Sequence, residues 1–306
     1  MDYVLTTEAL SKHYGHFKAL DGLNMHVPRG SVYGLVGRNG AGKTTFIRLL
    51  CGLQSPTSGS YSLYGVPNTD RGLSKIRRRM GAVVETPSIY LDLTAEDNLK
   101  EQYLILGRPS FDGIAELLKL VGLEDTGRKK ARNFSLGMKQ RLGIALALVG
   151  DPDLVILDEP INGLDPQGIA EVRNTIELLN REKGITFIIS SHILGELAKF
   201  ATNYGIIHGG QLLEELSMEE LLEKCTHRII LNTAAAPQAC TALEKLGITR
   251  YKVTDKATVE IYERLDEIPA VTAALCAAGI PVNGIQLKQQ ELEDYFLGLT
   301  GGTQNA

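Results

Sequence analysis

A loop rich in glycine carries the residue types that bind phosphate. Residues 37–45 match the pattern G-x-x-x-x-G-K-[ST] at every specified position. The apolar run 31–36 before the loop is typical of a buried strand, and the run 46–50 after it is typical of a helix. Such a loop wraps closely around an anion and presents the positive end of a helix to it. The pattern predicts binding of a nucleoside triphosphate such as ATP through Gly37, Asn39, Gly40, Ala41, Gly42, Lys43, Thr44 and Thr45.

Within this loop, Lys43 and Thr44 have separate expected roles. The Lys43 ammonium is expected to reach the β- and γ-phosphates, and the Thr44 hydroxyl to bind Mg²⁺. A second acidic element follows the apolar run 154–157, where Asp158 and Glu159 end a predicted buried strand. Ligand sites of doubly wound sheets lie at such strand ends. We therefore expect Asp158 to hold Mg²⁺ and Glu159 to polarise the attacking water.

Composition limits the classes of protein that this chain can belong to. It has 306 residues, of which 43% are hydrophobic and 22% charged, as in ordinary globular proteins. A net charge of −4 argues against a generic nucleic-acid binder, so no nucleic-acid partner is expected. No run reaches the roughly 18 apolar residues of a membrane span, and residues 1–6 do not resemble a signal peptide. Together with the scattered cysteines, this predicts a cytoplasmic location.

The order of predicted elements indicates an α/β fold with two domains. Residues 1–225 alternate strands and helices, which is typical of a largely parallel sheet, and a helical insertion occupies about residues 87–150. Residues 226–306 form a small α+β domain. Its elements follow the order βαββαβ, the ferredoxin-like alternation, with a final helix from Glu291.

Further along the chain, the motifs come in a family-specific order. Ser135 and Gly137 precede a helical run, as in the Leu-Ser-Gly-Gly-Gln signature, although its first glycine and its glutamine are replaced. The segment 162–165 follows the acidic pair, and His192 closes a later strand. Tyr14 lies near the start of the chain. With the phosphate loop, this order resembles the nucleotide-binding subunits of ABC (ATP-binding cassette) transporters, which are P-loop NTPases.

The resemblance implies how the site is completed and which partners the chain has. Two such domains sandwich two ATP molecules, so that Ser135 and Gly137 of one copy bind the γ-phosphate held by the other. The implied partners are a second copy, or a second ABC subunit, and an integral-membrane permease that keeps the protein at the inner face of the membrane. His192 is implied as the switch histidine of catalysis. Tyr14 is implied to stack on adenine, with Phe17 as the alternative.

Glu85 departs from the family pattern, which usually has a glutamine that touches Mg²⁺ and the attacking water. A carboxylate here is expected to take part in catalysis and to bind the metal more strongly than an amide. Together with the signature variant, Glu85 makes the chain similar to the subgroup that exports or resists peptide antibiotics, such as bacitracin and lantibiotics. The alternatives are a soluble ABC ATPase without a permease, or an ABC subunit for another substrate, including an importer. The C-terminal domain is left open between regulation, dimer stabilisation and packing alone.

Overall fold

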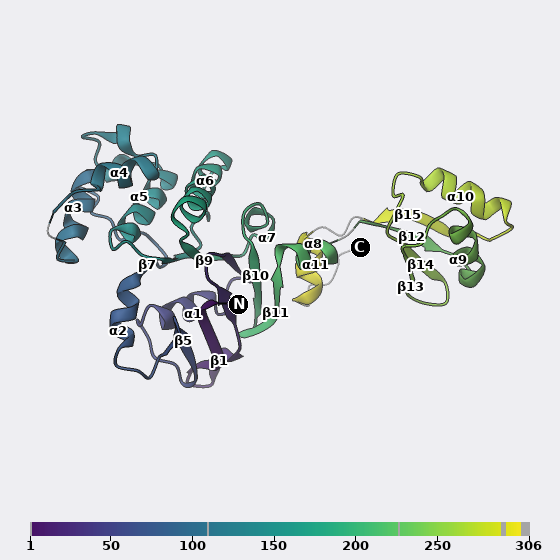
Figure 1. Cartoon of the computed structure of the whole chain (residues 1–306), viewed down its shortest axis with the longest axis horizontal. Helices are drawn as coiled ribbons and strands as arrows, with labels where there is room; N and C mark the ends of the chain where they lie inside the picture. The colour runs from purple at the N-terminus through teal and green to yellow at the C-terminus, as the bar shows by residue number, and fades with distance from the viewer. Residues whose placement is uncertain (1, 109, 226, 289–291, 301–306) are drawn as a thin grey trace. The chain divides into compact units, whose positions relative to one another are not determined.

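The computed structural model describes residues 2–108, 110–225, 227–288 and 292–300. It divides into two compact units, Met1–Met218 and Glu219–Ala306 (Figure 1). The described residues form two sheets in the first unit and one in the second. The first unit is a mixed α/β domain that carries the phosphate loop. The second is a small α+β domain. The units are therefore described separately.

A six-stranded sheet forms the centre of the first unit, in the order β11-β10-β4-β9-β8-β7. All neighbouring pairs are parallel except β10 and β11. Residues of β4, β8 and β9 are buried throughout, as expected for strands covered on both faces. This confirms the predicted parallel sheet. Its strands are β4 (Val32–Val36), β7 (Met80–Val83), β8 (Leu154–Asp158), β9 (Thr186–Ser191), β10 (Asn203–His208) and β11 (Gln211–Ser217).

A second, antiparallel sheet was not foreseen from the sequence. Its order is β2-β1-β5-β6, with β3 also paired to β1. Helix α1 (Lys43–Leu50) packs between the two sheets. Its apolar side chains belong to one core cluster that also contains residues of both sheets. This packing fixes the position of α1, whose first turn ends the phosphate loop. The strands are β1 (Tyr3–Tyr14), β2 (Phe17–Leu23), β3 (His26–Pro28), β5 (Ser58–Leu63) and β6 (Val66–Pro67).

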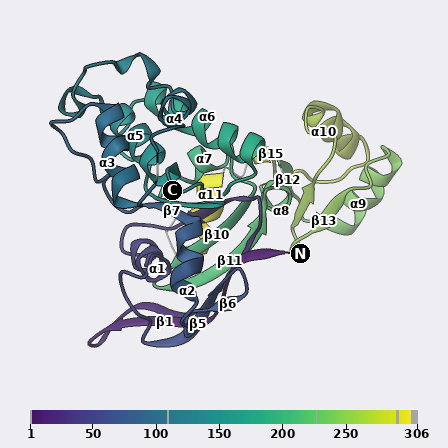
Figure 2. The same ribbon diagram turned by 60° about the vertical axis from the view of Figure 1, so that its left-hand side comes forward.

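On the other side of the parallel sheet lies a group of helices, visible in both views (Figures 1 and 2). Three of them, α3 (Ala95–Ile105), α4 (Ile114–Leu120) and α5 (Leu136–Leu148), lie between β7 and β8 in the chain. The Thr94 hydroxyl caps α3 by accepting from the Asp97 amide at 3.1 Å. The remaining helices of this unit are α2 (Leu73–Ile76), α6 (Pro166–Lys183), α7 (Leu194–Leu197) and the short 3₁₀ turns Arg77–Arg79, Glu124–Thr126 and Ala131–Asn133. Among the helices described here, none is both long and apolar enough to cross a membrane.

The second unit has the predicted ferredoxin-like topology. Its strands pair in the order β13-β14-β12-β15, all antiparallel, and α9 and α10 supply apolar residues to one core cluster with them. The expected start of the final helix, Glu291, lies outside the described residues, and the helix is seen from Leu292. The elements are α8 (Met218–Lys224), β12 (Arg228–Asn232), α9 (Ala236–Lys245), β13 (Tyr251–Val253), β14 (Thr258–Ile261), α10 (Ile268–Ala277), β15 (Gly284–Lys288) and α11 (Leu292–Leu299).

Close packing between β7 and α5 generates a test of the fold. A Cβ added at Gly81 would lie 2.2 Å from the carbonyl oxygen of Ala147, so backbone would have to move. We expect Gly81→Ala to lower the free energy of unfolding by about 1–3 kcal/mol, the usual cost of overpacking. Urea unfolding followed by circular dichroism measures this change. Gly150→Ala is the matched control, since its nearest atom would be 3.7 Å away. Equal unfolding midpoints for the two variants would contradict the packing argument.

Candidate nucleotide site

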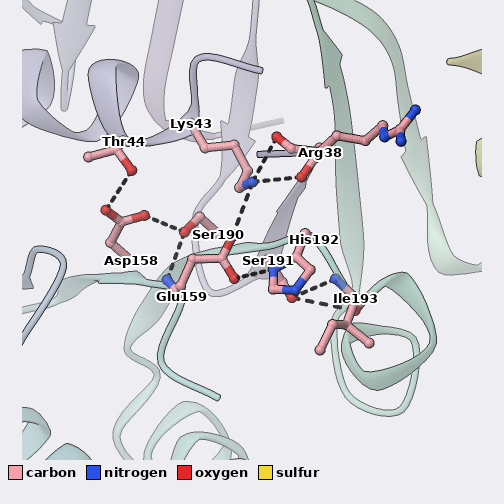
Figure 3. A network of polar contacts seen from close by, with 10 residues as sticks. Arg38, Lys43, Thr44, Asp158, Glu159, Ser190, Ser191, His192 and Ile193 are labelled. Carbon is pink, nitrogen blue, oxygen red and sulfur yellow. Dashed lines mark hydrogen bonds and ion pairs between the residues drawn. The ribbon is translucent and has the colours of Figure 1, made fainter. Parts of the chain in front are cut away.

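The site lies where three parallel strands of the first unit end together (Figure 3). Strand β9 is paired with β4 on one side and β8 on the other, and Ser191 is in register with Val36. On the β8 side, Ser190 is in register with Asp158. The residues that follow β4, β8 and β9 therefore share one edge of the sheet, as the strand-end rule predicts.

The loop between β4 and α1 has the backbone shape that its glycines predict. Gly42, just before α1, has φ +110°, a backbone conformation that residues with a Cβ rarely adopt. A Cβ there would also lie 2.6 Å from the carbonyl oxygen of Ala19. The loop is thus held close to the antiparallel sheet, and α1 begins directly at Lys43.

Lys43 is nearly closed off from water, with 6% of its surface exposed. Its Nζ donates to the carbonyl oxygens of Gly37 at 2.6 Å and Arg38 at 3.3 Å. The same Nζ forms an ion pair with Glu159 Oε1 at 3.1 Å. Burial of a cation is costly unless it has such partners. The loop lysine is therefore paired with the predicted catalytic carboxylate.

Glu159 connects Lys43 to His192. Glu159 Oε2 lies 2.9 Å from His192 Nδ1, so its two oxygens contact two different partners. The backbone of Glu159 has φ +50°, an unusual value for a residue other than glycine. Its amide donates to Ser190 Oγ at 2.8 Å, which supports this conformation. The structure thus brings Lys43, Glu159 and His192 together, as the sequence predicts for one site.

Asp158 is held by two hydroxyl groups from different elements. Thr44 Oγ1 donates to Asp158 Oδ2 at 2.9 Å, and Ser190 Oγ donates to Asp158 Oδ1 at 2.6 Å. A hydroxyl and a carboxylate are the hard oxygen ligands that Mg²⁺ prefers. The adjacent Thr44 and Asp158 oxygens fit a metal ion that is also bound by substrate phosphates.

Glu85 lies in a different environment from the other carboxylates. Its side chain is 56% exposed and forms an ion pair with Arg48 of α1. In the part of the chain that the structure describes, no recorded contact joins Glu85 to Thr44 or Asp158. Its expected place at the metal stays a prediction, and it would require the carboxylate to leave Arg48.

Ser135 and Gly137 form a separate helix start. Ser135 caps α5, and its hydroxyl accepts from the Met138 amide at 3.2 Å. Gly137 is buried against the next helix, since a Cβ there would lie 3.4 Å from Gly168 Cα. For the described residues, no contact is recorded between this pair and the phosphate loop of the same chain. The γ-phosphate contact predicted for Ser135 and Gly137 would therefore require an ATP molecule that is held by a different phosphate loop.

Tyr14 and Phe17 face each other at the end of the β1–β2 hairpin. Both rings are exposed, as a base-stacking residue must be. Tyr14 is already engaged, because its hydroxyl donates to Gln54 and the Lys12 ammonium lies 5.4 Å from its ring centroid. Both residues remain candidates for adenine stacking.

Two polar residues of the site were not identified from the sequence. Ser190 lies two residues before the predicted switch histidine His192, and its hydroxyl contacts both acidic residues. Arg48 was treated as part of a helical run. Only the parallel alignment of β8 with β9 shows that Ser190 lies beside Asp158. The spacing of four residues between Thr44 and Arg48 puts both on one helix face.

The thiol of Cys51 lies directly after α1, close to this network. Burial raises its pKa to about 11, while the nearby Arg77 lowers it and Asp158 raises it. The thiol is therefore protonated at neutral pH, and it adds no charge to the site.

Comparison with known proteins decides the family. The model of the ABC transporter family matches residues 20–162. The bacitracin transport ATP-binding protein BcrA of Bacillus licheniformis is 42% identical over 303 residues, which are 99% of each chain. This chain belongs to the ABC transporter family. It is an ATP-binding subunit that hydrolyses ATP.

Two further comparisons agree with this ABC subunit assignment. The lantibiotic transport ATP-binding protein SrtF of Streptococcus pyogenes is 44% identical over 230 residues, covering 74% of this chain and 98% of SrtF. The bacterial ABC transporter cassette MJ0796, solved as a dimer, has a TM-score of 0.62 and 25% identity. That match covers 70% of this chain and 98% of MJ0796. The predicted P-loop fold is confirmed.

The contacts of Lys43 predict how the ATP affinity of this ABC subunit changes when the lysine is removed. Lys43→Ala removes the loop cation and leaves Glu159 as an uncompensated carboxylate beside the phosphates. We expect ATP affinity to fall at least about tenfold, since hydrogen bonds to charged groups contribute about 1.5–3 kcal/mol. Isothermal titration calorimetry with ATP measures the affinity. Lys183→Ala, which removes an exposed pair with Glu116, is the control and should bind normally. An unchanged dissociation constant in Lys43→Ala would refute the assignment.

Proposed function

We propose that this chain supplies the energy for export of a peptide antibiotic, or a similar amphiphile, through a separate membrane permease. Full-length similarity to a bacitracin transport ATP-binding protein is the observation that carries this proposal. Similarity to a lantibiotic transport protein supports the same substrate class. In this proposal the chain is cytoplasmic and is bound to the inner face of the cell membrane through the permease.

In the proposed hydrolysis, ATP changes the partners of Lys43. Negative phosphate oxygens attract the ammonium, and Glu159 then loses the ion pair that it has at 3.1 Å. The freed carboxylate accepts a proton from water as the water oxygen bonds to the γ-phosphorus, and the bond to the ADP oxygen breaks. His192, 2.9 Å from Glu159 Oε2, orients the carboxylate.

Thr44 and Asp158 are the proposed metal ligands. Mg²⁺, when bound with ATP, neutralises charge on the β- and γ-phosphates. Thr44 Oγ1 and Asp158 Oδ2 would hold it, because these adjacent oxygens fit its chemistry. Glu85 is proposed as an additional ligand in the nucleotide-bound state, after separation from Arg48.

A second copy of the chain, or a second ABC subunit, is proposed to complete each site. Ser135 and Gly137 lie at the start of α5, whose N-terminus is suited to binding phosphate. Among the described residues, no contact is recorded between either of them and the phosphate loop of their own chain. Their amides suit the γ-phosphate held by a partner. The dimeric state of the similar cassette MJ0796 supports this arrangement. ATP then links the two subunits, and its hydrolysis releases them.

The permease is proposed to dock near Glu85 and the segment that follows it. A groove of about 490 Å³ lies beside this segment, between β7, α3 and α5. Its lining combines apolar and basic residues, including Val83, Pro87, Leu106, Arg77 and Arg78. A short helix from a cytoplasmic loop of the permease fits a groove of this character.

The base assignment predicts a trapped ATP-bound state. Glu159→Gln keeps the size of the side chain but removes the proton acceptor, so turnover should fall by at least about a hundredfold. ATP binding should persist, and the variant should form a dimer with ATP but not with ADP. A phosphate-release assay measures turnover, and size-exclusion chromatography with light scattering measures the dimer. Glu124→Gln, an exposed change, is the control. Wild-type hydrolysis by Glu159→Gln would exclude Glu159 as the base.

The transporter proposal is tested by capture of the partner. Tagged Glu159→Gln protein with ATP is incubated with detergent-solubilised native membranes, and bound proteins are identified by mass spectrometry. Lys43→Ala protein serves as the nucleotide-deficient control. ATP-dependent recovery of a membrane protein with several spans supports the proposal. Recovery of ribosomal or DNA-associated proteins alone would overturn it in favour of a soluble ABC ATPase.

The substrate class needs a separate measurement on the reconstituted complex. In proteoliposomes, ATP hydrolysis is measured with bacitracin, a lantibiotic or a non-peptide detergent. Stimulation by a peptide antibiotic, and not by the detergent, is the expected result. Stimulation by neither peptide would contradict the proposed substrate class.

A further inference from the structure

The proposed function gives no role to Ser190, a polar residue of the site. It lies in the central strand β9 with its surface fully buried. Its hydroxyl donates to Asp158 Oδ1 at 2.6 Å and accepts from the Glu159 amide at 2.8 Å (Figure 3). One hydroxyl therefore contacts both residues of the acidic pair.

The two oxygens of Asp158 are held differently. Oδ2 faces Thr44 Oγ1, which is the proposed metal ligand, whereas Oδ1 faces Ser190. A bond from Ser190 to Oδ1 fixes the rotation of the carboxylate and leaves Oδ2 directed at the metal position. Partners that orient a metal ligand in this way commonly affect metal affinity or activity by about 10–100-fold.

The second bond of Ser190 acts on the backbone of Glu159. The φ of +50° at this residue is a left-handed conformation that residues other than glycine rarely adopt unless their surroundings support it. The Glu159 amide points at Ser190 Oγ, and this bond helps to hold the side chain between Lys43 and His192. A serine hydroxyl can donate one bond and accept others at the same time, so both contacts coexist.

We propose that Ser190 is a positioning residue that aligns Asp158 for the metal and Glu159 for proton transfer through a single hydroxyl group. The inference rests on the proposed metal site at Thr44 and Asp158. It assigns Ser190 no contact with ATP. Loss of its hydroxyl should therefore weaken metal binding and lower kcat, while the affinity for metal-free nucleotide stays unchanged.

Binding of Mn²⁺ in the presence of ADP tests the first effect without turnover. Free Mn²⁺ is measured by electron paramagnetic resonance, and ADP affinity is measured by calorimetry in EDTA. Ser190→Ala should weaken Mn²⁺ binding about tenfold and leave ADP affinity in EDTA within twofold of the wild type. Ser190→Thr keeps the hydroxyl and should restore Mn²⁺ binding. In ATPase assays at saturating Mg²⁺, Ser190→Ala should lower kcat about tenfold with an unchanged KM for ATP.

Thr186→Val is the matched control for loss of a buried hydroxyl. Thr186 starts the same strand, is 1% exposed and accepts from the Gly30 amide at 2.9 Å, away from the acidic pair. It should bind Mn²⁺ like the wild type even if its melting temperature falls. Equal weakening of Mn²⁺ binding in Thr186→Val and Ser190→Ala would assign the effect to strand stability and overturn the proposal.

Mn²⁺ affinity of Ser190→Ala within twofold of the wild type would also overturn it. If Ser190→Ala does not fold, Ser190→Cys repeats the test, because the thiol keeps similar volume but donates only weakly. Wild-type Mn²⁺ affinity in that variant counts against the proposal, and weakened affinity supports it. Wild-type protein that fails to hydrolyse Mg-ATP would refute the proposed function itself, whereas failure confined to the Ser190 variants would refute only this inference.

Discussion

The common direction of β4, β9 and β8 is the constraint on which the site depends. Their parallel register puts the phosphate loop, the acidic pair and His192 at one edge of the sheet. A slip of one residue between β8 and β9 would turn the side chains to the opposite face. The Ser190 hydroxyl would then lose Asp158.

The buried charge of Lys43 adds an electrostatic constraint. Two backbone carbonyls and Glu159 surround the ammonium. When ATP binds as proposed, phosphate oxygens replace Glu159 and keep the Lys43 ammonium compensated. In the proposed cycle, the same exchange makes the carboxylate available to water. Binding and activation of the base are thereby coupled through one ion pair.

Local patterns predicted much of the fold and site, and nonlocal pairings account for what was missed. The phosphate loop and the acidic pair could be found because their chemistry is contained in short segments. The antiparallel sheet was missed because β1 has irregular burial and register shifts, so it lacks a simple alternation. Ser190 and Arg48 act on residues far away in the sequence, and only the strand register and the position of α1 reveal their partners. The βαββαβ order of the second unit was recognisable because its elements alternate regularly.

Glu85, which replaces the glutamine usual in the family, forms an ion pair with Arg48. A glutamine at this position would leave Arg48 without this negative partner, so the two residues act as one feature of the chain. Both side chains are substantially exposed, and such ion pairs contribute only about 0–1 kcal/mol. Separation of the pair is therefore inexpensive. Because Arg48 belongs to the helix that begins at Lys43, its ion pair links Glu85 to the helix that follows the phosphate loop. The metal contact proposed for Glu85 therefore requires the loss of a weak, exposed ion pair and not of a buried one.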